Sequence, residues 1–282
     1  MAGPHLVRAY KMGILASLFA LFPLAAPGLE TWQALAAGMQ LGVLRAGQAG
    51  DARITVVRID PNLWELAIAG ISMTGEAAGR TAREWCVGQK LAAAINAGMF
   101  ATDYRTHVGY LRFRGQVNSG HVNRYQSVAA FDPLGGKGRP RFRIFDLDAP
   151  GVAMQSILAD YASAVQNLRL IKRPGRNRWP RQDKKWSAAA LGEDEAGRIL
   201  FIFCRSPFSM HDLNQELLAS GMGLVAAQHL EGGPEAQLYL KVGGVELEMI
   251  GSYETSFRED DGNAAAWPIP NVLGVRPRKA ND

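Results

Sequence analysis

A glutamate followed by two glycines, Glu231-Gly232-Gly233, stands between a hydrophobic run and a strand-like run in the last third of the chain. Glycines reach positive φ and leave their N–H groups bare, so this pair could form a small nest for an anion. A carboxyl beside a bound phosphate can act as a general acid or base. An ordinary turn before a strand accounts for the same residues equally well.

A second polar group closes the strand-like run that leads into Asn96-Ala97-Gly98-Met99-Phe100. An asparagine amide donates and accepts hydrogen bonds at once, so Asn96 suits the orientation of a carbonyl or a hydroxyl group. Gly98 would let the backbone approach a ligand closely. Taken alone, the stretch is more typical of a turn.

Two regions could hold a phosphate. Arg205 ends the apolar run ILFIFC just before a helix signal at Ser209, and strand rims and helix N-termini are common anion sites. The basic stretch 171–185 includes Arg178 and Trp179, which suit a sugar phosphate or single-stranded nucleic acid. The alternatives are a surface arginine at a sheet edge and a solvated basic loop.

Two histidines, His107 and His229, lie beside these segments and could carry protons near neutral pH, or simply be hydrogen-bonded. The sequence contains no GxSxG, HExxH, Walker or GxGxxG motif. The histidines have no metal-ligand spacing, so no metal site and no cofactor is predicted, and a need for a divalent metal is left open.

Composition sets the broad class of the protein. The chain has 282 residues with 48% hydrophobic content, which excludes a disordered chain and allows a sizeable core. A net charge of +5 and a pI near 9.3 weakly favour anionic partners, such as phosphates, anionic lipid headgroups or nucleic acid. Cys86 and Cys204 could pair in an oxidising compartment, or remain buried thiols.

Residues 1–28 have the order of a secretory signal. Arg8 and Lys11 precede an apolar run over residues 12–24, and Ala25 and Ala26 follow. We expect a signal peptide or N-terminal anchor here, a linker over 29–51 and one domain over 52–282. The protein is then exported, to the periplasm or outside the cell, and touches a membrane only through an uncleaved leader. Export makes a nucleic-acid partner unexpected.

Periodicity and turn residues predict many strands and few helices. Thr81 and Glu84 form a capping box for a short helix, and Ser209 caps another. The predicted hairpins are 52–60 with 63–71, 187–191 with 198–203, and 237–242 with 245–250; further strands are 107–114, 126–131 and 141–145, helices are 81–89, 154–165 and 209–221, and 173–185 is a long loop. This pattern predicts an α+β single domain with an extensive, mostly antiparallel twisted sheet and a few packed helices.

Taken in order, these segments resemble the phosphodiester glycosidase family over residues 52–275. The resemblance rests on NAGMF at 96–100, Gln166-Asn167, LGEDEAGRILFIF at 191–203 and LEGGPEAQL at 230–238. The family pattern has aspartate where Glu231 stands and Gly-Ser where Pro234-Glu235 stand, and only Gln166 is kept of its Gln-x-Gly-Pro motif. These departures indicate a divergent subgroup.

The resemblance implies hydrolysis of a sugar-1-phosphodiester. Glu231 would be the catalytic carboxylate and Asn96 an orienting group. Arg205 and Arg178 would bind the phosphate, Gly232 and Gly233 would shape the pocket floor, and His107, Gln166 and His229 would contact the substrate. Whether Glu235 is a second carboxylate is open.

Two other functions compete with hydrolysis. One is a non-catalytic envelope protein that binds anionic polysaccharide or peptidoglycan through the same cleft. The other is single-strand nucleic-acid binding through the basic stretch 171–185.

Overall fold

The computed structural model describes residues 28–47, 52–135 and 138–279. The predicted leader therefore lies outside the described residues, apart from Gly28. Within the described ranges, no helix is both long enough and apolar enough to cross a membrane.

Two antiparallel sheets account for most of the described chain, as the predicted α+β class requires. The 12-stranded sheet contains β1 (Gly28–Ala36), β2 (Met39–Arg45), β3 (Arg53–Ile59), β6 (Leu111–Phe113), β7 (Gln116–Ser119), β8 (Ser127–Pro133), β9 (Phe142–Asp146), β10 (Tyr161–Lys172), β11 (Arg176–Asn177), β12 (Trp186–Asp194), β13 (Ile199–Phe208) and β14 (Leu224–Gly232). The 5-stranded sheet has the order β16 (Val245–Ile250), β15 (Gln237–Val242), β5 (Ala93–Asn96), β17 (Asn271–Pro277) and β4 (Trp64–Gly70).

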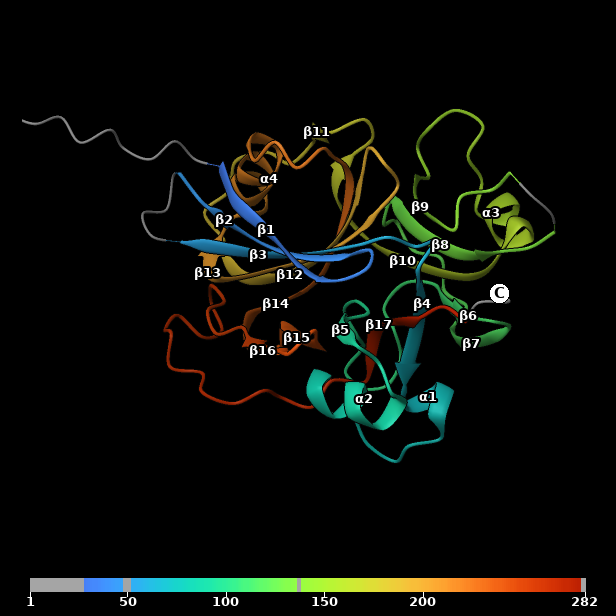
Figure 1. Ribbon diagram of the computed structural model, residues 1–282, viewed down its shortest axis with the longest axis horizontal. Helices are drawn as coiled ribbons and strands as arrows, with labels where there is room; N and C mark the ends of the chain where they lie inside the picture. Colours follow the sequence, from blue (N-terminus) through green and yellow to red (C-terminus); the bar gives the residue numbers. More distant parts are fainter. Residues whose placement is uncertain (1–27, 48–51, 136–137, 280–282) are drawn as a thin grey trace, which may run out of the picture.

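The sheets stack face to face, with helices on the outer faces (Figure 1). The main core lies between them, where side chains such as Val57 and Phe201 of the large sheet meet Ile95 and Leu273 of the small one. A second core fills the space between the large sheet and α4 (Met210–Ala219), and a third lies between the small sheet and α2 (Ala82–Gln89). Sheet on sheet with covering helices is a standard layered solution for burying apolar faces.

Local signals fix the helices where the sequence predicts them. At α2 the Thr81 side chain accepts from the Glu84 N–H, and the Glu84 side chain accepts from the Thr81 N–H, so the capping box is confirmed. At α4 the Ser209 side chain accepts from the Asp212 N–H, which confirms that cap. The remaining helical elements are short: α1 (Ile71–Thr74), α3 (Met154–Asp160) and the 3-10 turn η1 (Gly233–Glu235).

The two C-terminal hairpin predictions are confirmed, and the first is wrong. β12 pairs with β13, and β15 pairs with β16, through the expected turns. β3 and β4 are both strands, but β3 pairs with β2 and β13 in the large sheet while β4 pairs with β17 in the small one. The chain therefore passes from one sheet to the other at the turn after Asp60. Each of the two strands packs one face against the central core between the sheets.

Two further predictions fail for related reasons. The range 29–51, expected as a linker, contains most of β1 and all of β2, which extend the large sheet beyond β3. The helix expected over 154–165 ends at Asp160, and Tyr161 begins the long strand β10. β10 is buried along much of its length by β8 on one edge and by β6 and β14 further along, so tertiary pairing overrides the helical spacing.

The two cysteines are both buried and unpaired. Cys86 lies on α2 and Cys204 on β13, in different cores, and burial raises the pKa of each thiol to about 12.

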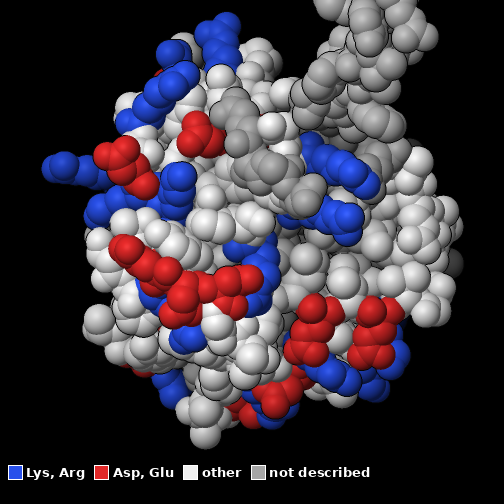
Figure 2. Space-filling view, turned by 90° about the vertical axis from the view of Figure 1, so that its left-hand side faces the viewer, with Lys and Arg blue, Asp and Glu red and all other residues white. Residues whose placement is uncertain are grey.

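Charged side chains of both signs are mixed on the side of the molecule seen in Figure 2, with acidic groups set among Lys and Arg. The described part of that face is therefore not the continuous basic surface that nucleic acids favour.

Candidate active site

Glu231 lies at the end of β14, directly after a β-bulge. The register with β12 slips between Ala189 and Ala190, so β14 carries one extra residue before Glu231. Bulges re-aim side chains next to functional sites. The Glu231 side chain is buried, and its Oε1 accepts from the Gly232 N–H at 3.0 Å. Burial, then the charges of Glu235 and Glu254, raise its pKa to about 8.

Three carboxyl groups therefore share this corner of the molecule. Glu235 sits in η1, and Glu254 lies in the loop after β16. Burial raises the pKa of both, and the charge of Glu254 raises that of Glu235 further. A hydrogen bond from Trp186 acts the other way on Glu254, because it stabilises the ionised form. Glu231 is the most deeply buried of the three carboxyls, and Glu254 is the one with a hydrogen bond that favours its ionised form.

The glycines after Glu231 shape the approach of Glu254. Gly232 is extended, with φ of −127°, and Gly233 has φ of 60°. A Cβ at Gly233 would lie 2.5 Å from Glu254 Oε2, so only glycine fits both the backbone and the neighbouring carboxyl. The expected anion nest is not formed, since the Gly232 N–H is committed to Glu231.

Asn96 is buried at the end of β5, where it holds the chain that follows the glycines. Its Nδ2 donates to the Glu235 carbonyl at 2.9 Å, and its Oδ1 accepts from the Gln237 N–H at 2.7 Å. Both ends of the amide are therefore bound to backbone. Asn96, on the 5-stranded sheet, therefore positions the backbone of Glu235. The sequence had suggested that its amide would orient a group of the substrate.

Gly98 brings the end of β5 against the large sheet. A Cβ there would meet Asn167 Oδ1 at 2.0 Å and His107 Cε1 at 2.4 Å. The Asn167 amide donates to the Ala97 carbonyl at 2.9 Å, and the His107 Nε2 donates to the Gln166 carbonyl at 2.9 Å. Asn167 and His107 are thereby fixed at the seam where the two sheets meet.

Gln166 is committed to the loop before β8. Its Oε1 accepts from the N–H groups of Tyr110 and Asn123, and its Nε2 donates to the carbonyls of Asn123 and Tyr125. Burial and the nearby charge of Glu231 raise the pKa of Tyr125. Gln166 therefore acts through Tyr125, which it holds near Glu231, and its own side chain has no free group for a substrate.

Both histidines predicted at the site are buried and neutral. Burial lowers the pKa of His107 and of His229 to about 4, so neither carries a proton to or from a substrate near neutral pH. The Nδ1 atom of each has no hydrogen-bond partner among the described residues. Buried polar atoms are normally paired, so both nitrogens are exceptions, and that of His107 is an acceptor because its Nε2 donates to Gln166.

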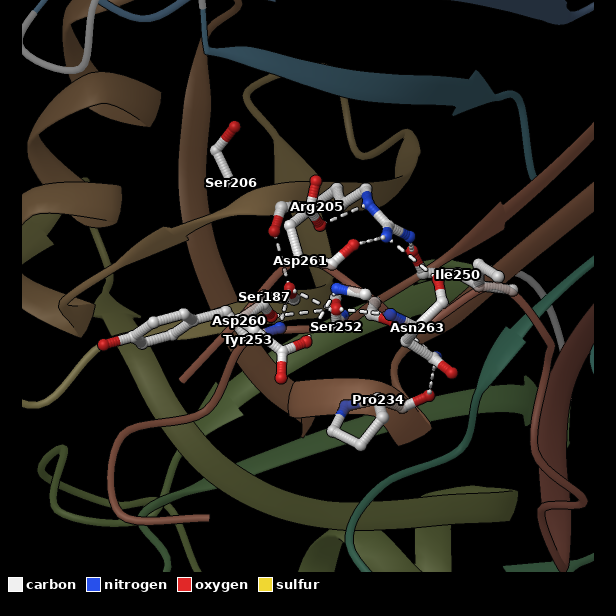
Figure 3. Close-up of polar contacts among 12 residues, drawn as sticks. Ser187, Arg205, Ser206, Pro234, Ile250, Ser252, Tyr253, Asp260, Asp261 and Asn263 are labelled. Atoms are coloured by element: carbon white, nitrogen blue, oxygen red, sulfur yellow. Dashed lines mark hydrogen bonds and ion pairs between the residues drawn. The ribbon is translucent and has the colours of Figure 1, made fainter. Parts of the chain in front are cut away.

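Arg205 is occupied by the protein itself (Figure 3). Its Nε donates to Asp261 Oδ1 at 2.7 Å, and its Nη atoms donate to the carbonyls of Ile250, Asp261 and Asn263 at 2.7, 3.0 and 2.9 Å. Four of its five N–H groups are used, which leaves no fork for a phosphate. Arg205 instead clamps both ends of the loop that carries Glu254.

The same loop is tied to β12 from the other side. Ser187 Oγ donates to the Arg205 carbonyl and accepts from the N–H groups of Ser252 and Tyr253. Asn263 Nδ2 donates to the Gly251 carbonyl at 2.7 Å, and Figure 3 shows this network beneath the Arg205 side chain. Glu254 is therefore held against Gly233 by a braced loop.

Arg178 lies apart from Arg205. It is exposed and lines a cavity of about 270 Å³ together with Arg124 and Trp179.

Three residues near the site, Glu254, Tyr125 and Asn167, were not predicted as site residues. Nothing in their local sequence distinguishes them from ordinary loop and strand residues. No group of three or more His, Cys, Asp or Glu in the described ranges has a geometry that could hold a metal ion.

Comparison with known proteins identifies the family. The sequence model for phosphodiester glycosidases matches residues 89–276, which confirms the resemblance. No curated protein matches the chain in sequence.

Two solved structures share the fold. The catalytic domain of zebrafish N-acetylglucosamine-1-phosphodiester alpha-N-acetylglucosaminidase, auto-inhibited by its pro-peptide, has a TM-score of 0.59 and 14% identity, over 90% of this chain and 85% of that one. A hypothetical protein from Synechocystis has a TM-score of 0.57 and 16% identity over 90% of this chain. The present chain spans 64% of that Synechocystis chain.

Proposed function

Because this chain belongs to the phosphodiester glycosidase family, we propose that it hydrolyses sugar-1-phosphodiesters at the carboxyl cluster around Glu231. The observation that carries the proposal is the group of Glu231, Glu235 and Glu254, whose pKa values are all raised and which act on one another. Carboxyls with separated pKa values are the basis of acid and base assignments in glycosidases.

Glu231 is the proposed acid. With a pKa of about 8 it holds a proton at neutral pH, and an uncharged carboxyl does not repel an anionic phosphodiester. In the reaction the bond between the anomeric carbon and the phosphate oxygen breaks, and Glu231 donates its proton to the departing phosphate. A phosphomonoester is already a good leaving group, so this proton matters less than in an ordinary glycoside.

Glu254 is the proposed base or nucleophile. Its ionised form is favoured by the Trp186 hydrogen bond, and its carboxyl reaches Gly233 beside Glu231. It would take a proton from the attacking water, or attack the anomeric carbon itself before water releases the sugar.

We propose further that the protein is exported and acts on envelope or exopolysaccharide phosphodiesters. The support is the order of residues 1–28, with Arg8 and Lys11 ahead of the apolar run. Mass spectrometry of the protein purified from the periplasm or medium should find an N-terminus near residue 28. A cytoplasmic protein that retains Met1 would contradict export.

The activity is tested with a panel of sugar-1-phosphodiesters that share a methyl aglycone and differ in the sugar. We expect release of methyl phosphate from at least one member, and no release from the matching methyl glycosides. Glycan binding by calorimetry with no turnover of any diester would instead favour the non-catalytic envelope protein and overturn the proposal.

A further inference from the structure

A cavity of about 270 Å³ lies beside the carboxyl cluster and has no part in the chemistry described above. It is open to solvent and is bordered by the loop before β8, by β10 and by the segment that follows β11. Its lining residues are Arg124, Gln126, Leu168, Arg169 and the Arg178–Pro180 segment. Cavities of this size hold a single small group, at the lower end of the range for ligand sites.

The cavity combines a fixed apolar wall with two available cations. The Trp179 indole N–H donates to the Arg169 carbonyl at 2.7 Å, which holds the ring in place. Arg169 itself is committed to Asp146 and Asp148, at 3.2 and 2.6 Å. Arg124 and Arg178, by contrast, are exposed, and their guanidinium groups have no hydrogen bond or ion pair to any described residue. Unpaired guanidinium forks are suited to phosphate and carboxylate groups.

The cavity adjoins the proposed catalytic centre. Arg124 and Gln126 flank Tyr125, whose phenol feels the charge of Glu231. Leu168 pairs in register with His229, two residues before Glu231. Directly opposed residues in an antiparallel pair face the same side of a sheet, so Leu168 and His229 share the face of the second core, whereas Glu231, opposite Ala189, faces the central core. Tyr125 is therefore the link between the cavity and the carboxyl cluster.

The cavity and the carboxyl cluster differ in charge. The groups that act on Glu231 are carboxyls and one backbone N–H, with no cation among them. The cavity supplies uncommitted positive charge next to Tyr125, through Arg124 and Arg178. A substrate that carries an anionic group beyond its scissile phosphate would place that group against Arg124 and Arg178.

We propose that this cavity is the leaving-group subsite and takes an anionic sugar, a saccharide with a carboxylate or phosphate, against Trp179 and the two arginines. The proposal rests on the proposed function, and it defines the substrate class as phosphodiesters between two sugars of which the leaving one is acidic. The same residues could stack a nucleic-acid base, so single-strand binding is one of the outcomes that the test distinguishes.

The test compares aglycones that differ by one charge. Sugar-1-phosphate esters of glucose, glucuronate and glucose 6-phosphate are hydrolysed by wild type and by the Arg124→Ala, Arg178→Ala and Arg176→Ala variants. We expect KM for the two charged aglycones to rise about tenfold in Arg124→Ala and Arg178→Ala, the loss of one charge-assisted contact. KM for the glucose aglycone should stay within about twofold, and kcat should not change.

Arg176 provides the matched control, because it is an exposed arginine of the same segment that does not line the cavity. Its alanine variant should behave as wild type with all three aglycones. Equal KM changes for charged and neutral aglycones, or none in either cavity variant, would overturn the proposal. The two charged aglycones distinguish a carboxylate from a phosphate ligand. A KM change with glucose 6-phosphate alone identifies a phosphate site, and a KM change with both aglycones identifies a general anion site.

A direct binding measurement tests the subsite independently of catalysis. If wild type hydrolyses none of the esters, the proposed function fails, and calorimetry with free glucuronate and free glucose 6-phosphate decides the subsite alone. Binding that is lost in Arg178→Ala and kept in Arg176→Ala supports it. Absence of binding, or tight and steeply salt-dependent binding of a fluorescent oligonucleotide that Arg178→Ala weakens, would contradict it.

Discussion

Two buried glutamates, Glu65 on β4 and Glu231 on β14, have opposite electrostatic surroundings. Both are nearly excluded from solvent, with exposed fractions of 6% and 8%, although the carboxyl of Glu231 is the more deeply buried. Burial raises the pKa of Glu65, but Arg276 and Arg114, with Nη2 atoms 2.8 and 2.9 Å from its Oε1, outweigh it and the pKa is lowered. At Glu231 burial acts together with two other carboxyls, and the pKa rises to about 8.

The difference shows how this fold treats carboxyls that it buries for structure. Glu193, inside the large sheet, is likewise met by Arg143, by Arg173 and by the Ile144 N–H, although burial still raises its pKa. Arginines are therefore supplied to buried carboxyls elsewhere and not to Glu231. A strongly perturbed carboxyl without a counter-ion is a feature of functional sites, because it costs stability and serves chemistry.

The largest effect should come from Glu231→Gln, which keeps the shape and removes the proton donor. We expect kcat on a sugar-1-phosphodiester to fall by about 10²- to 10⁴-fold, the usual contribution of general acid–base catalysis. Glu248→Gln, at an exposed glutamate of β16, is the control and should keep full activity. Undiminished turnover in a folded Glu231→Gln protein would remove Glu231 from the mechanism.

Stability against pH should separate the two glutamates next. A carboxyl with a folded-state pKa of about 8 and an ordinary unfolded value stabilises the fold below pH of about 4.5 and loses that contribution as pH rises through 8. The free energy of unfolding of wild type should therefore fall relative to Glu231→Gln between pH 5 and 8, by at most about 1.4 kcal/mol per pH unit. Urea titrations at several pH values measure this, and a constant gap between the proteins would refute the raised pKa.

Glu65→Gln should act in the opposite sense at neutral pH. It removes the charge that holds Arg114 and Arg276 across the β4 and β17 pair, and we expect a loss of about 1–3 kcal/mol, reduced by the partial exposure of both arginines. Urea unfolding at pH 7 is the measurement. Glu231→Gln should show no such loss of unfolding free energy. Equal destabilisation by both variants would contradict the difference between Glu65, which is paired with arginines, and Glu231, which is not.

Arg205→Ala should give the smallest of these effects. It releases the loop that carries Glu254 without touching the carboxyls, so kcat/KM should fall by about tenfold through misplacement of one catalytic group. Limited proteolysis should then cut the loop between residues 251 and 263 faster than in wild type. Ser206→Ala, next to the clamp, is the control. Unchanged proteolysis with lost activity would point back to a direct phosphate contact for Arg205.

Much of the fold could be predicted because its signals are local. The capping residues Thr81 and Ser209 and the two glycine-marked hairpins depend on neighbours in sequence. The sheet to which a strand belongs does not: β3 and β4 have the same apolar character and a turn between them, yet they belong to different layers. A strand pattern specifies a buried face and leaves the pairing partner open.

The convergence of some candidate residues was predictable from the sequence, and their contacts were less so. Glu231, its glycines and Asn96 do converge, because the ends of β14 and β5 meet at η1. The roles of Asn96, Gln166 and Arg205 depend on bonds to backbone groups far away in sequence, which residue type does not reveal. Glu254 has no local signal, since it reaches the site only through a loop clamped at both ends.

The most direct test of the central claim is a titration of glutamate side-chain carboxyls by ¹³C NMR in wild type, Glu231→Gln and Glu65→Gln. The signal absent from Glu231→Gln should titrate near pH 8, and the signal absent from Glu65→Gln should titrate below the ordinary glutamate value of about 4.3. A Glu231 signal that titrates at or below that ordinary value would show an ionised carboxylate at neutral pH and would contradict its assignment as the acid.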